Sequence, residues 1–119
     1  MNVHQTLSAS VTLLFAATVA SPPALAYDLA KARSVEPQLS WSTKATIYEV
    51  ERCIMALDLP DAPAIYRAPD KPDESLMYWP VAFHTPMVIE IFRREDTTKV
   101  EVKNPPKNIA DRIATCALR

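Results

Sequence analysis

The residues best suited to chemistry lie in the stretch MYWPVAFHTPM, between Met77 and Met87. Thioether sulfurs and imidazole nitrogens bind soft or borderline metal ions such as copper, and Met77, His84 and Met87 supply them. Trp79 could contact a cuprous ion through the face of its ring. Methionines and aromatic residues on a strand more often fill or cover a core. A small-molecule or soft-metal carrier that uses Met77–Met87 is therefore the alternative hypothesis for function.

Other catalytic arrangements have weaker support. Asp70, Asp73 and Glu74 are close in the sequence and could bind a hard cation, but Lys71 and the neighbouring prolines favour a solvated turn. His84 is the only histidine after the first ten residues, so any Ser-His-Asp or Cys-His site would depend on it. We expect neither enzyme activity nor a cofactor.

Glycine is absent from all 119 residues, whereas an average chain contains about 7%. Phosphate-binding P-loops, dinucleotide-binding turns and the G-x-S-x-G nucleophile elbow all need glycine for positive φ angles or for close backbone approach. The composition excludes these three sites. Turns in this chain must instead use Pro, Asp, Asn and Ser.

The two cysteines, Cys53 and Cys116, lie in segments with helical periodicity. Apolar residues recur every three or four positions along STKATIYEVERCIMALDL and along NPPKNIADRIATCALR, as they do on the buried side of a helix. Both cysteines fall on or beside those apolar stripes. We predict a disulfide that joins the first helix of the domain to the last and closes a loop of about 60 residues.

Boundary residues give the expected limits of these helices. Ser40 or Ser42 is expected to cap the first helix, and prolines after Leu59 end it. Asn104 is expected to cap the last helix, with Pro105 at the first helical position.

Between the helices the sequence predicts strands. They are a short strand around Ile65 and Tyr66, SLMYWPVAF, the strongly alternating MVIEIFRR, and VEVK. The expected fold is an α+β two-layer sandwich in the order helix, three or four antiparallel strands, helix, in a single domain over residues 42–119. Both helices should cover one face of the sheet.

Residues 1–26 have the features of a cleaved secretory signal peptide. The apolar core VTLLFAATVA is followed by Ala-Leu-Ala before Tyr27. We expect a periplasmic or secreted protein with no stable membrane anchor after cleavage, and a flexible N-terminal arm over residues 27–41. The net charge is −1, which argues against nucleic acid as a partner.

These features favour a small exported, non-enzymatic protein that binds a protein or cell-envelope partner, in an accessory or inhibitor-like role. If both helices cover one face of the sheet, the other face is free to bind. Tyr66, Tyr78, Phe92 and Arg94 are the candidate partner-binding residues there, because exposed aromatic residues beside charges concentrate binding energy. The sequence names neither the partner nor the oligomeric state.

Overall fold

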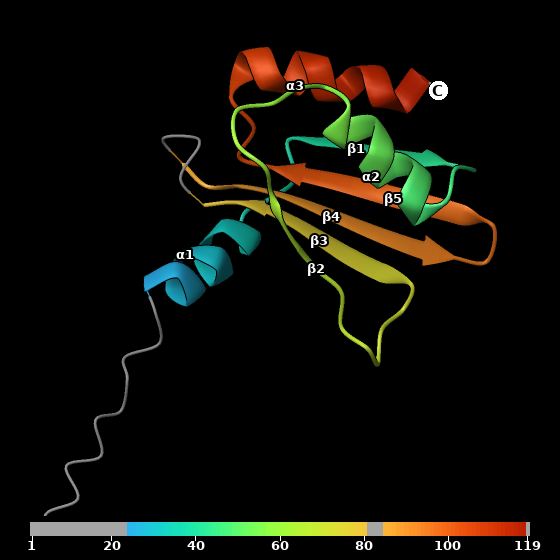
Figure 1. The fold of residues 1–119 in the computed structure, drawn as a ribbon, viewed down its shortest axis with the longest axis horizontal. Helices are drawn as coiled ribbons and strands as arrows, with labels where there is room; N and C mark the ends of the chain where they lie inside the picture. The colour runs from blue at the N-terminus through green and yellow to red at the C-terminus, as the bar shows by residue number, and fades with distance from the viewer. Residues whose placement is uncertain (1–23, 81–84, 119) are drawn as a thin grey trace, which may run out of the picture.

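The computed structural model describes residues 24–80 and 85–118. Most of the predicted signal peptide and His84 lie outside the described residues. The elements are α1 (Ala24–Arg33), β1 (Leu39–Thr43), α2 (Ile47–Met55), β2 (Ala64–Tyr66), β3 (Glu74–Trp79), β4 (Met87–Arg94), β5 (Thr97–Lys103), α3 (Lys107–Ala114) and the 3₁₀ helix η1 (Thr115–Leu118) (Figure 1). None of the described helices is both long and apolar enough to cross a bilayer.

The five strands form one antiparallel sheet in the order β1-β5-β4-β3-β2. The mixed α and β composition and the antiparallel sheet predicted from the sequence are confirmed. The order of elements differs from the expected one, because α1 and β1 precede α2. Residues 27–41, which were expected to form a flexible arm, contain most of α1 and the first half of β1.

α2 begins at a capping box rather than at a serine of the preceding segment. Glu49 N–H donates to Thr46 Oγ1, and the Thr46 N–H donates back to the Glu49 carboxylate, so two free helix-end donors are satisfied. The prediction that Ser40 or Ser42 caps this helix was wrong, since both residues belong to β1. The helix also ends at Met55, before Leu59.

α3 begins at Lys107, with Pro106 as its N-cap. The predicted cap, Asn104, instead turns the chain with a positive φ of 57°. Asp58, Asp61 and Glu95 also have positive φ, so this glycine-free chain uses Asp, Glu and Asn where glycine would be the usual choice.

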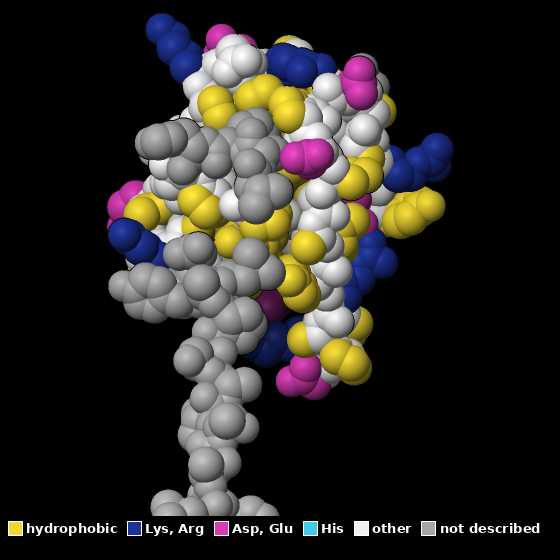
Figure 2. Space-filling model, turned by 60° about the vertical axis from the view of Figure 1, so that its left-hand side comes forward, with side chains coloured by type: hydrophobic (Ala, Val, Ile, Leu, Met, Phe, Trp, Pro, Cys, Tyr) yellow, Lys and Arg dark blue, Asp and Glu magenta, His cyan; other side chains and the backbone are white. Residues whose placement is uncertain are grey.

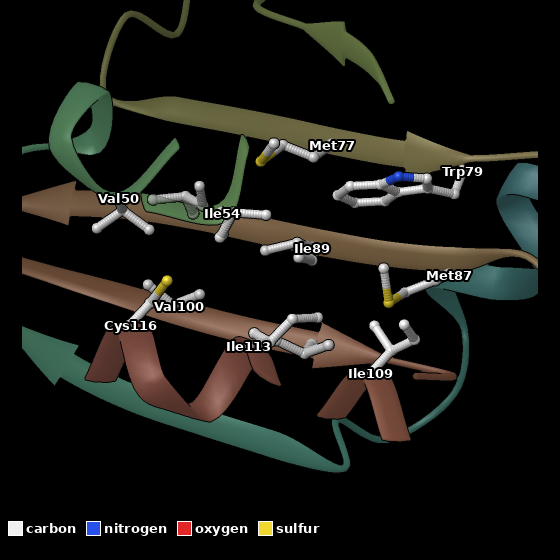
Figure 3. Close-up of a cluster of buried hydrophobic side chains, with 12 residues drawn as sticks. Val50, Ile54, Met77, Trp79, Met87, Ile89, Val100, Ile109, Ile113 and Cys116 are labelled. Atoms are coloured by element: carbon white, nitrogen blue, oxygen red, sulfur yellow. The ribbon is translucent and has the colours of Figure 1, made fainter. Parts of the chain in front are cut away.

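The main core lies on the side of the sheet that we call the first face. Side chains from α2 and α3, including Val50, Ile54, Ile109 and Ile113, point onto sheet residues of β3, β4 and β5 (Figure 3). The Cys53–Cys116 disulfide joins α2 to η1 with a Cα–Cα distance of 5.9 Å, so the predicted pairing is confirmed.

A smaller core lies on the opposite side, the second face. There Leu29 and Ala32 of α1 pack against Tyr78, Val88 and Leu76 of the sheet. Figure 1 shows α1 on the other side of the sheet from α2 and α3. The sheet is thus covered by two helices on its first face and, over one end only, by α1 on its second face.

Candidate functional site

Three of the four predicted partner-binding residues lie on the part of the second face that α1 leaves open. Tyr66 is paired with Leu76, which is in turn paired with Glu90 on β4. Phe92 is two residues along β4 from Glu90, and Arg94 is two residues further. Because side chains two apart on a strand share a face, these residues look out from the same side of the sheet.

Two adjoining hollows indent this open surface. One, of about 180 Å³, lies between Arg33 of α1 and Tyr66 of β2. The other, of about 500 Å³, extends to Ser42 of β1. Glu74 and Phe92 line both hollows, so the two adjoin and together make a depression across the strands.

We call this depression the sheet groove. It is lined by Arg33, Ser42, Tyr66, Ala68, Lys71, Glu74, Ser75, Leu76, Glu90, Phe92, Arg94, Thr97 and Lys99.

The floor of the sheet groove is apolar and aromatic. Phe92 and Leu76 are partly buried, and Tyr66 keeps 47% of its surface exposed. These three side chains lie on neighbouring strands β4, β3 and β2. They give the groove a surface that a partner's apolar side chains can cover, which is the usual source of binding energy at an interface.

Four basic side chains surround that floor. Lys71 Nζ lies 4.0 Å from Glu74, and Lys99 Nζ lies 3.3 Å from the carboxylate of Glu101. Arg94 has no ion pair within the described residues. Arg33, the fourth, is 54% exposed, but it binds the buried Glu90 and so joins a cluster of charges at the end of the groove under α1.

This cluster joins α1 to the sheet through buried charges. Glu90, 7% exposed, accepts from Arg33 Nε at 2.6 Å and from Lys103 Nζ at 3.1 Å. Lys103, 8% exposed, also donates to the Arg33 carbonyl at 2.6 Å, and Asn104 Nδ2 lies 3.4 Å from the Ala32 carbonyl. These contacts satisfy carbonyls at the C-terminal end of α1, where cations are favoured. The end wall of the groove is therefore fixed by polar contacts.

Tyr78 does not belong to the open surface. Its side chain lies on the second face but is only 1% exposed, because α1 packs over it. The neighbouring aromatic residues of β3 lie on opposite faces of the sheet, as alternation along a strand requires: Tyr78 packs against α1, and Trp79 packs in the first-face core.

Leu76, Lys99 and Arg33 also line the groove, and none of them was among the predicted partner-binding residues. The alternation around Tyr78 in SLMYW could have placed Leu76 on the second face. Lys99 depends on the β4–β5 register, in which it faces Phe92. Arg33 had no local signal, since its place depends on where α1 docks.

The alternative metal-binding residues do not gather at a surface. Met77 and Met87 are fully buried in the first-face core, and Met87 faces Trp79 across the β3–β4 pair. His84 lies outside the described residues. Among residues 24–80 and 85–118, no three His, Cys, Asp or Glu side chains are grouped as a metal site. The two methionines thus act as core residues, a role that suits the flexible, apolar side chain of methionine.

Two polar contacts hold the turns that flank the groove. Glu51 of α2 is buried and accepts from Ser75 Oγ at 2.6 Å and from the Arg67 guanidinium, which ties the β2–β3 segment to α2. Asp96 lies in the β4–β5 turn, 2.7 Å from the Lys44 ammonium. That ammonium lowers the pKa of the Asp96 carboxyl, and the Thr97 hydroxyl adds to the effect. Both contacts position strands rather than presenting groups to a ligand.

The side of the molecule shown in Figure 2 carries hydrophobic side chains separated by individual charged side chains of both signs. The sheet groove combines a hollow, an aromatic floor and a basic rim.

The chain matches no protein-family model, no curated protein and no solved structure.

Proposed function

We propose that this chain is an exported, non-enzymatic binding protein whose sheet groove holds part of a protein partner. The observation that carries the proposal is that Phe92 and Glu74 line both hollows, which therefore adjoin on the open part of the second face. Together they offer an apolar and aromatic floor with a charged rim, which is the arrangement of protein interfaces.

The form of the groove favours a macromolecular partner over a small ligand. Sites for small molecules bury most of the ligand in a cleft or cavity. Both hollows here are open to solvent and adjoin along the sheet face, so a small molecule would keep much of its surface in water. A protein segment that lies along the groove can cover Phe92, Leu76 and Tyr66 together.

The disulfide supports the exported location. Disulfides persist in oxidising compartments such as the periplasm or the extracellular space. Cys53 and Cys116 are paired here, which agrees with the secretory leader predicted from the sequence.

The proposal is tested with the mature, oxidised protein and two groove variants. The partner is first captured from envelope extract and identified, and its dissociation constant is then measured with purified components. Tyr66→Ala and Phe92→Ala should each weaken binding about tenfold or more, because truncating an aromatic anchor at an interface costs 2 kcal/mol or more in typical cases.

Tyr48→Ala is the matched control. Tyr48 is 61% exposed on α2, away from the groove, and the centre of its ring lies 5.8 Å from the Arg52 guanidinium carbon. This variant should bind as the wild type does. Equal affinities for all three variants, or a loss confined to Tyr48→Ala, would refute the groove as the binding surface.

A further inference from the structure

We infer that the occupant of the sheet groove is an extended, acidic peptide segment that crosses the strands. This inference rests on the proposed function and specifies the chemistry of the partner. It is argued from the direction of the groove, the distribution of charge along it and the position of its apolar floor.

The direction of the groove sets the length of the segment. Its lining runs from Tyr66 on edge strand β2 to Ser42 on edge strand β1, across the whole order of the sheet. Four spacings between adjacent strands amount to about 19 Å, and extended chain covers about 3.3 Å per residue. A segment of about six residues therefore spans the groove.

The charge of the groove is opposite in sign to that of the chain. Its lining has four basic side chains and two carboxylates, which gives +2, whereas the whole chain carries −1. One of the two carboxylates, Glu90, is already paired with Lys103 as well as with Arg33. The groove therefore favours a negatively charged occupant.

The basic group most available to the occupant, Arg94, lies at the β4–β5 end. It has no ion pair in the described chain, whereas Lys99 Nζ lies 3.3 Å from Glu101 and Lys71 Nζ lies 4.0 Å from Glu74. The hydroxyls of Ser42 and Thr97 line the same hollow and can donate to a carboxylate. We place the acidic residues of the segment at this end.

The opposite end is better suited to apolar residues. Lys71 is close to Glu74, and Arg33 is held by Glu90, so both cations there already face a carboxylate. Leu76 and Tyr66 provide the apolar surface at this end. The segment should therefore carry carboxylates in one half and apolar or aromatic side chains in the other.

The position of Glu74 argues against an anionic lipid surface as the occupant. Glu74 lines both hollows and so lies in the middle of the groove. A dense layer of phosphates would face this carboxylate, whereas a peptide can place an uncharged residue opposite it. The hollowed, aromatic floor also suits a single chain better than a flat surface.

The experiment compares three labelled six-residue peptides that share an apolar half and differ only in the other half, which contains Glu, Gln or Lys. Binding to the mature, oxidised protein is measured by fluorescence anisotropy. The Glu peptide should bind about five- to tenfold more tightly than the Gln peptide at low salt, since exposed ion pairs each contribute up to about 1 kcal/mol. That advantage should shrink at salt on the order of 0.5 M.

Variants show whether the preference arises in the groove. The double variant Arg94→Gln/Lys99→Gln should remove the advantage of the Glu peptide and leave the affinity for the Gln peptide nearly unchanged. Arg52→Gln/Lys107→Gln removes the same charge from the helices that cover the first face, and it should leave the advantage intact.

Other outcomes overturn the inference in distinguishable ways. Equal affinity for the Glu and Gln peptides, or tighter binding of the Lys peptide, overturns the acidic occupant while the groove remains a binding surface. If no peptide binds, or only phosphatidylglycerol vesicles bind, the peptide occupant is wrong. The proposed function is then judged separately, by whether Phe92→Ala still weakens the captured partner.

Discussion

At the scale of residues, the second face contains a buried ion pair between Glu90 and Lys103. Both side chains are nearly buried, and their charges are satisfied by each other, by Arg33 and by the Arg33 carbonyl. Removing a charge from water is costly unless it is paired and hydrogen-bonded. The arrangement fixes where the C-terminal end of α1 lies and hence where the groove ends.

Glu90→Gln should destabilise the protein by about 3 kcal/mol, because it leaves the Lys103 ammonium buried without its counter-charge. The free energy of unfolding, measured by urea denaturation of the oxidised protein, checks this. Glu74→Gln is the matched control, since Glu74 and Lys71 form an exposed ion pair, and it should change stability by no more than about 0.5 kcal/mol. If both variants are equally stable, the buried pair contributes no more than a surface pair.

Alternation along single strands made part of this site predictable. Glu90, Phe92 and Arg94 follow one another at intervals of two in MVIEIFRR, so their common face was readable from the sequence. Tyr78 was assigned to the same face, and the structure places it there. The burial of Tyr78 was not predictable, because α1 causes it. The residues of α1 had been assigned to the signal peptide and the flexible arm.

At the scale of elements, local patterns predicted α2, β2, β3, β4, β5 and α3, and they missed α1 and β1. β1 is only five residues long, and its strand conformation depends on pairing with β5, about 60 residues away in sequence. The capping box of α2 was a different case. Thr46 and Glu49 have the spacing of that motif, so the helix start was present in the sequence and was overlooked in favour of earlier serines.

The disulfide is the main covalent constraint between elements, and its removal should be costly. The double variant Cys53→Ser/Cys116→Ser should lower the free energy of unfolding by about 4 kcal/mol, because the bridge closes a loop with a sequence separation of 63. Urea denaturation of the oxidised wild type and of the variant measures the difference. Against a total stability of about 5–15 kcal/mol for a small domain, this loss is large.

Reductant provides the control for this measurement. It should lower the stability of the wild type to that of the double variant and leave the double variant itself unchanged. If wild type and variant have the same urea midpoint without reductant, then packing of α2 and η1 against the sheet holds these helices without help from the covalent bond.

For the whole molecule, the two faces of the sheet are covered to different extents. The first face is covered by α2 and α3, the disulfide ties α2 to η1 directly after α3, and this face contains most of the core. The second face is covered only at one end, by the short helix α1. The size of the open surface is therefore set by α1, and the docking of this helix determines whether Tyr78 and Val88 are buried or join the groove.

Ala32 is the residue through which this docking can be tested. It is buried against the second face, while its neighbour Lys31 is exposed. Ala32→Gln introduces a bulky polar side chain into a closely packed contact, which costs about 1–3 kcal/mol, and should displace α1 from Tyr78 and Val88. Lys31→Gln changes the same helix on its exposed side and should leave docking intact.

Hydrogen–deuterium exchange and the binding of a hydrophobic dye distinguish the two variants. Ala32→Gln should increase dye fluorescence and speed exchange in α1, while α2, α3 and the strands of the first-face core keep their protection, because the disulfide and the main core are untouched. The emission of Trp41 and Trp79, both on the first face, should not shift. If instead the whole sheet loses protection together with α1, the second-face helix is an integral part of the fold, and the boundary of the groove is as stable as the core itself.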